Sequence, residues 1–125
     1  LTLALSNPGH FESVSAFAPI CNPMKSDWGQ KQFEAYLGND HAAWEKHDAT
    51  VLMRSNGTKC PVLIDTGTDD QFYDLLGTSA FASAVADQKV EASIRLQKVY
   101  DHSYFFISTF MPEHIEFHAN ALSRK

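Results

Sequence analysis

The chain has 125 residues, of which 44% are hydrophobic, which is enough to build one hydrophobic core and too little for two. Its 10 basic and 15 acidic residues give a formal net charge of −5, and no basic stripe is present that could neutralise a phosphate backbone, which argues against nucleic acid as a partner. No apolar run approaches the roughly 18 residues that span a bilayer, and no basic segment precedes an apolar one as in a signal peptide, so we expect a soluble, cytoplasmic protein without a membrane partner.

The first residues, Leu1-Thr2-Leu3-Ala4-Leu5, read as a helix that lacks an N-cap residue and a polar lead-in. This helix should end at Ser6-Asn7-Pro8-Gly9, because proline cannot continue it and glycine suits the turn that follows. We therefore expect further residues of the same domain upstream of Leu1.

Strands and helices alternate along the rest of the chain. Residues 14–18, 60–65 and 92–98 are predicted strands, and short helices are predicted within residues 22–55, including one over 48–54. Longer helices are predicted over 75–88 and 104–123, with Pro112 kinking the last one or marking its start. This alternation is typical of an α/β fold with a parallel sheet, and no repeat or linker divides the chain.

Sites in such sheets lie beyond the carboxyl ends of the strands, which here selects residues 19–22, 67–72 and 101–104. Asp70 lies in a glycine turn after one strand, and His102 lies in the loop after the next. Their loops should meet, so the carboxylate could bind one imidazole nitrogen and leave the other as a base. The order Asp then His fits a hydrolase triad of the α/β-hydrolase type, but the chain contains no G-x-S-x-G nucleophile motif.

Four stretches of the sequence carry a family resemblance: "LSNPGHFESVSAFAPICNP", "YLGND", "LIDTGTDDQF" and "YDHSYFFISTFMPEHIEFHA". They resemble the C-terminal part of the S-formylglutathione hydrolases, the esterase D family, and the similarity covers nearly the whole chain. By this resemblance, residues 1–125 form the C-terminal portion of a single α/β-hydrolase domain. The family's Gly-x-x-Asp turn starts at Gly67 and places the acid at Asp70, the base falls on His102, and the nucleophilic serine lies a few residues before Leu1. The segment after Phe72 is a little shorter than is usual in the family.

The resemblance implies a cytosolic serine thioesterase that hydrolyses S-formylglutathione to glutathione and formate, with side activity on short-chain carboxylic esters. It implies a small-molecule substrate, a homodimer and no cofactor or metal. The oxyanion hole would lie outside this chain. Asp70 and His102 alone should therefore perform no covalent catalysis.

Structural alternatives accompany each candidate residue. A loop histidine such as His102 is commonly structural, Asp69 suits a solvated turn, and Asp65 at a strand end could cap backbone groups. Trp28 and Phe72 are candidates for lining a substrate pocket, although aromatic residues in such segments more often serve packing.

His114 and His118 are spaced i and i+4 on one helix and could hold zinc. The zincin motif places its glutamate directly after the first histidine, whereas Glu116 comes one residue late, and no third ligand is evident. A half-exposed terminal helix explains the two histidines more simply.

The two cysteines, Cys21 and Cys60, are far apart and form no CxxC motif, which favours reduced thiols over a disulfide. Cys60 before Pro61 is expected to serve packing. Cys21 lies near the expected site and is a weak candidate for a modifiable thiol.

Other function classes stay open at this point. The hydrolase could be a general short-chain carboxylesterase, or the chain could be a small regulatory domain in which Asp65, Asp69 and Asp70 hold Mg²⁺. It could also be a non-catalytic α/β fragment that needs a partner chain to complete its sheet.

Overall fold

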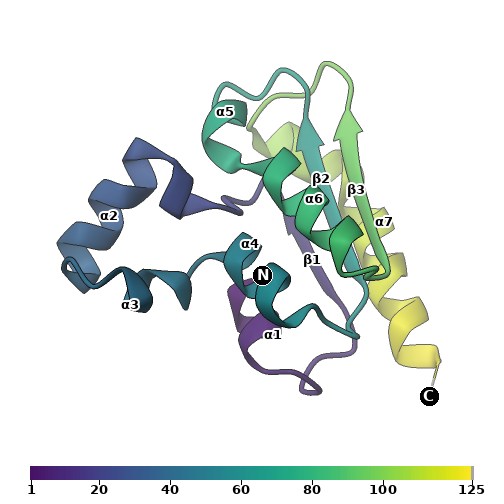
Figure 1. Cartoon of the computed structure of the whole chain (residues 1–125). Coiled ribbons are helices and arrows are strands. Elements are labelled where there is room, and N and C mark those ends of the chain that lie inside the picture. Colours follow the sequence, from purple (N-terminus) through teal and green to yellow (C-terminus); the bar gives the residue numbers. More distant parts are fainter. Residues whose placement is uncertain (125) are drawn as a thin grey trace.

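Three parallel strands form the central sheet of the computed structural model, which describes residues 1–124. Their order is β1-β2-β3, with bounds Val14–Phe17, Val62–Gly67 and Ala92–Gln97 (Figure 1). The register aligns Phe17 with Asp65 and Asp65 with Arg95. The predicted α/β fold with a parallel sheet is therefore confirmed.

Helices cover both faces of the sheet. In chain order they are α1 (Thr2–Ser6), the 3₁₀ helix η1 (Pro23–Lys25), α2 (Asp27–Leu37), α3 (His41–Glu45), α4 (Ala49–Asn56), α5 (Tyr73–Leu76), α6 (Thr78–Asp87) and α7 (Tyr104–Ser123). Figure 1 shows α6 in front of the strands and α7 behind them, with α2 lying to one side. No helix within residues 1–124 is long and apolar enough to cross a membrane.

The two faces of the sheet pack against different cores. Side chains alternate between the faces along each strand, so Val62 and Ile64 join the cluster formed with α1, α4 and α6. The opposite face carries Phe17 and packs against Phe106 near the start of α7. Helix α7 occupies this second face, and His102 lies in the loop that precedes α7. The position of α7 therefore determines where His102 lies at the edge of the sheet.

Two predicted helices differ from the structure. The helix predicted over 75–88 is split at Gly77, whose φ of 70° lies in the left-handed region, into α5 and α6. Pro112 does not mark the start of the last helix, because α7 begins at Tyr104 and continues through Pro112. Buried Phe106 and His114 fix this helix on both sides of the proline, so tertiary packing outweighs its local cost of about 3 kcal/mol.

The predicted strand over 60–65 begins and ends two residues later, as Val62–Gly67. The extension arises because Thr66 and Gly67 pair with Leu96 and Gln97 of β3, a contact that local sequence does not reveal. The helix predicted over 48–54 is present as α4, and Asp48 is its N-cap: the side chain of Asp48 accepts hydrogen bonds from the backbone N–H groups of Thr50 and Val51.

Gly67, the last residue of β2, has no room for a side chain. A Cβ atom there would overlap the carbonyl group of Tyr100, which is backbone and cannot rotate away. Replacing Gly67 with Ala is therefore expected to lower the free energy of unfolding by about 1–3 kcal/mol. Urea denaturation would measure this loss, with Ser93→Ala at an exposed position of β3 as a control that should stay within about 0.5 kcal/mol of the wild type. An equal effect of the two substitutions would contradict the close approach.

Candidate active site

Asp70 and His102 lie side by side beyond the carboxyl ends of the strands. Asp70 belongs to the turn after β2, and His102 lies two residues before α7 begins at Tyr104. Backbone hydrogen bonds tie their loops together, from the N–H of Asp69 to the carbonyl of Tyr100 at 3.0 Å and from the N–H of Thr68 to the carbonyl of Gln97 at 3.0 Å. The predicted meeting of the two loops is thus present in the structure.

The two side chains share a short hydrogen bond. Nδ1 of His102 lies 2.8 Å from Oδ2 of Asp70, whose side chain is fully buried, while the imidazole is 42% exposed. The other carboxylate oxygen, Oδ1, accepts from the backbone N–H of Phe72 at 2.7 Å. A carboxylate only accepts hydrogen bonds, so Nδ1 carries the proton and the lone pair of Nε2 is left to act as a base.

The two predicted pocket residues differ in their relation to this pair. Phe72 meets the imidazole of His102 edge to face, with ring centroids 5.2 Å apart, and its own ring is partly exposed. Trp28 is an exposed residue of α2. Within the described part of the chain, the hydrogen bonds and ring contacts of the site join Asp70, His102 and Phe72 and leave Trp28 out. The pocket roles of both aromatic residues stay predictions.

The three aspartates after β2 do not converge on one point. Asp69 is exposed, as a solvated turn residue should be, and accepts a hydrogen bond from the Thr68 hydroxyl. Asp65 is fully buried and binds side chains of β3 and α7, so the interpretation that it caps backbone groups is wrong. Among residues 1–124, no group of three His, Cys, Asp or Glu side chains could hold a metal ion, which leaves the Mg²⁺ hypothesis without a ligand set.

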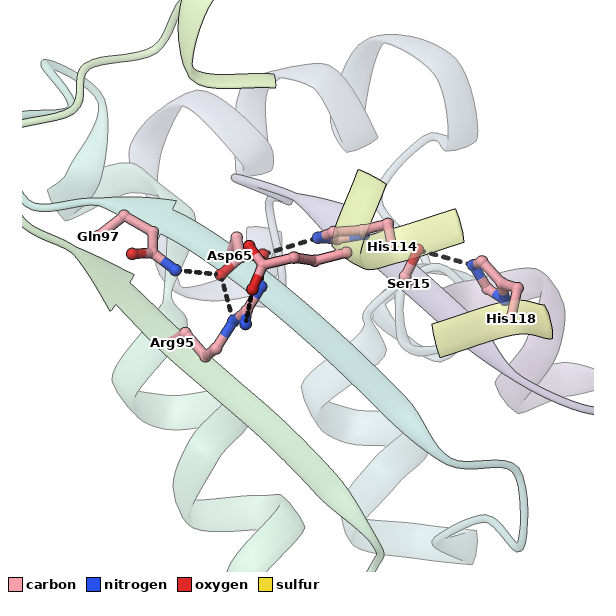
Figure 2. Close-up of polar contacts among 7 residues, drawn as sticks. Ser15, Asp65, Arg95, Gln97, His114 and His118 are labelled. Carbon is pink, nitrogen blue, oxygen red and sulfur yellow. Dashed lines mark hydrogen bonds and ion pairs between the residues drawn. The ribbon is translucent and has the colours of Figure 1, made fainter. Parts of the chain in front are cut away.

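Asp65 is the centre of a buried polar cluster that the sequence analysis missed (Figure 2). Its Oδ1 accepts from Nε of Arg95 at 2.7 Å and from Nε2 of Gln97 at 2.9 Å. Its Oδ2 accepts from Nη2 of Arg95 at 2.6 Å and from Nε2 of His114 at 2.7 Å. Burial alone would raise the pKa of Asp65, but the hydrogen bonds from Arg95, Gln97 and His114 together hold it below its ordinary value. The available signal was the pair of polar residues, Arg95 and Gln97, which are spaced two apart and therefore share one face of the strand.

The terminal helix α7 is half-exposed as predicted, and its two histidines lie on the side that faces the sheet. His114 is 2% exposed and stacks on the ring of Phe17, with centroids 3.9 Å apart. Nε2 of His118 lies 2.8 Å from the hydroxyl of Ser15 (Figure 2). Its Nδ1 lies 2.6 Å from the hydroxyl of Ser13. Burial, and secondarily the neighbouring His114, lower the pKa of His118. The i, i+4 spacing therefore joins α7 to the sheet through separate partners.

The two free cysteines differ in exposure. Cys21 is fully buried, and burial raises the pKa of its thiol to about 12, which does not suit the modifiable thiol considered for this position. Cys60 is partly exposed, and burial and then Glu12 raise the pKa of its thiol less strongly.

We therefore expect a disulfide reagent at pH 8 to label Cys60 in the folded protein and Cys21 only after denaturation. The mass of tryptic peptides after timed labelling would measure both rates. Equal labelling rates at the two positions would contradict the burial of Cys21. The Cys60→Ser variant, which should take up no label until it unfolds, is the control.

Comparisons with known proteins identify relatives of this chain. The model of the family named Esterase, described as "Putative esterase", matches residues 1–117. The S-formylglutathione hydrolase of Paracoccus denitrificans (strain Pd 1222) is 54% identical over 122 residues, and that of Rattus norvegicus is 48% identical over 126 residues. These alignments cover 98% of this chain and 44% and 45% of the two relatives, so the chain spans less than half of their length.

Solved structures show the same relationship. An S-formylglutathione hydrolase from Agrobacterium tumefaciens superimposes with a TM-score of 0.91 at 43% identity, over 97% of this chain and 44% of that one. Esterase B from Lactobacillus rhamnosis shares the fold alone, with a TM-score of 0.70 and 18% identity over 91% of this chain and 42% of its own.

Proposed function

The chain belongs to the esterase family, and we propose that it supplies the acid and the base of a serine thioesterase that hydrolyses S-formylglutathione to glutathione and formate. The observation that carries this proposal is the 2.8 Å hydrogen bond between Nδ1 of His102 and the buried carboxylate of Asp70. The names of the relatives that are 54% and 48% identical supply the substrate. The proposal takes the nucleophilic serine of the triad from outside residues 1–125.

In the proposed reaction, Nε2 of His102 takes the proton of the serine hydroxyl as the serine oxygen attacks the formyl carbon. Asp70 holds the imidazole in the required tautomer and stabilises the imidazolium that forms. The carbon–sulfur bond then breaks, and the imidazolium returns the proton to the departing thiolate. A water molecule, deprotonated by the same nitrogen, hydrolyses the formyl-serine to formate and restores the serine.

Phe72 is the proposed pocket residue with the most direct support. Its ring edge contacts the imidazole of His102, and part of the ring is exposed beside it. A formyl group is small, so an aromatic wall next to the base would limit the size of acyl group that fits. For Trp28 the proposal rests on its exposure on α2 alone.

The proposal is tested by steady-state kinetics on S-formylglutathione and on p-nitrophenyl acetate. The protein assayed, called the intact protein below, contains the proposed nucleophilic serine together with residues 1–125. We expect a higher kcat/KM for the thioester. A preference for p-nitrophenyl acetate would replace the proposal with a general carboxylesterase, and hydrolysis of neither substrate would overturn it. The His102→Gln variant is the control for hydrolysis that does not use this site.

The homodimer and the cytoplasmic location stay predictions from the family resemblance. Light scattering coupled to gel filtration would test the first, with a mass of twice the polypeptide expected. Cell fractionation would test the second.

A further inference from the structure

The acid and the base of the site stand on different elements. Asp70 follows β2 by three residues, whereas His102 precedes α7 by two. Their 2.8 Å contact therefore depends on the position of α7 on the sheet, that is, on how far the helix is shifted along its axis and how it is rotated about that axis. Phe106 of α7 packs on Phe17 of β1, and such hydrophobic packing is not directional. The directional contacts of α7 with the sheet are made by Glu113, His114 and His118.

His114 provides a directional contact on this helix. Its Nε2 lies 2.7 Å from Oδ2 of Asp65, in the central strand, and its ring stacks on Phe17 of β1. His114 follows His102 by 12 residues, which is about 18 Å along a helix. The bond is thus remote from the reacting atoms and cannot act on them by contact.

The acceptor of this bond is held rigidly. Arg95 binds both oxygens of Asp65, at 2.7 and 2.6 Å, and Gln97 binds Oδ1 at 2.9 Å (Figure 2). Asp65 is fully buried in β2, five residues before Asp70 in the same chain segment. The carboxylate that accepts the hydrogen bond from His114 is therefore fixed relative to the strand that leads to Asp70.

We propose that His114 is a positioning residue: by donating a hydrogen bond to Asp65 it fixes the place of α7 on the sheet and so holds His102 against Asp70. This inference adds to the proposed function a residue outside the triad, and its catalytic consequence rests on that function. Its geometric part concerns the Asp70–His102 bond and stands on its own.

The first test reads the tautomer of His102 by long-range ¹H–¹⁵N NMR, which identifies the ring nitrogen that bears the proton. In the wild type Nδ1 should bear it, because Asp70 accepts from that nitrogen. His114→Phe keeps a ring to stack on Phe17 but has no donor, and we expect the proton of His102 to move to Nε2 in a large fraction of molecules. If His114→Phe does not fold, His114→Met, which also lacks a donor, replaces it in this test. His114→Gln retains an N–H donor and should restore the Nδ1–H form.

The second test is kinetic and uses the intact protein. His114→Phe or His114→Met should lower kcat tenfold or more while changing KM less than twofold, and His114→Gln should recover most of the loss. Phe81→Leu is the matched control, because Phe81 is a fully buried residue of α6 on the opposite face of the sheet. It should lower the melting temperature comparably and leave kcat within twofold.

Wild-type kcat and an Nδ1–H tautomer in His114→Phe would overturn the proposal. It would also be overturned if Phe81→Leu lost as much kcat at equal stability, because the effect would then be general destabilisation. If the wild type hydrolyses neither a thioester nor an ester, the proposed function fails, and the NMR comparison still decides whether His114 positions His102.

Discussion

Replacing Asp70 with Asn is expected to lower kcat about 10⁴-fold, the size of effect seen when the acid of a serine-hydrolase triad becomes an amide. The structure gives the reason at this site. Oδ1 of Asp70 accepts the backbone N–H of Phe72, so the amide oxygen of an asparagine would keep that place and its NH₂ group would face His102. An NH₂ group donates to Nδ1, which forces the proton of the imidazole onto Nε2 and removes the base.

Steady-state kinetics on the intact protein would measure this loss, with circular dichroism to verify that the variant is folded. Asp69→Asn is the matched control, because the same chemical change is made one residue away on an exposed side chain. Its kcat should stay within twofold of the wild type. Equal losses for the two variants would argue that the charge of the turn, rather than the Asp70–His102 bond, matters.

Replacing Asp65 with Ala is expected to lower the free energy of unfolding by about 3 kcal/mol, at the lower end of the 3–5 kcal/mol typical of a broken buried pair. The substitution leaves the Nε2–H of His114 and the guanidinium of Arg95 without their shared acceptor. The Arg95 side chain is 33% exposed, so water can replace part of what it loses, which places the effect at the lower end. Urea denaturation at pH 7 would measure it. Glu113→Ala is the control, because its contact with Arg95 at 3.2 Å lies at the surface and should contribute less than about 1 kcal/mol.

The loss of stability caused by Asp65→Ala should depend on pH. The pKa of Asp65 is lower in the folded protein than its ordinary value of about 3.9, so its ionised form stabilises the fold. This contribution is complete above the unfolded pKa and is lost as the pH falls through the lower folded pKa. The difference in stability between the wild type and Asp65→Ala should therefore shrink below about pH 4. A difference that grows in acid would contradict the ionised, hydrogen-bonded state of Asp65.

The sheet and the meeting of Asp70 with His102 could be predicted because both follow from local patterns combined with one topological rule. Runs of apolar residues marked the first two strands, and alternation of apolar and polar residues marked the third. Parallel strands bring the loops after their carboxyl ends to one edge. The choice of Asp70 over its neighbours came from the family motif that starts at Gly67, since spacing alone left Asp65 and Asp69 as alternatives.

The buried cluster around Asp65 could not be predicted in the same way. Whether Arg95 lies opposite Asp65 depends on the register of β2 with β3, which is a contact between residues 30 positions apart. The burial of His114 likewise depends on which side of α7 turns to the sheet, and a helix with apolar residues around much of its circumference leaves that open. The sequence alone does not distinguish Gly77 from a glycine tolerated inside one helix. Its left-handed backbone, at a place where a Cβ atom would overlap Asn22, divides α5 from α6.

The central claim is that His102, oriented by Asp70, activates a serine. Intact-mass spectrometry after treatment with a fluorophosphonate tests it most directly, because this reagent reacts with activated serine hydroxyls. We predict one equivalent of adduct on the intact wild-type protein and, in the same time, less than one tenth of that on His102→Gln. Labelling of His102→Gln at the wild-type rate, or no labelling of the wild type, would contradict the claim.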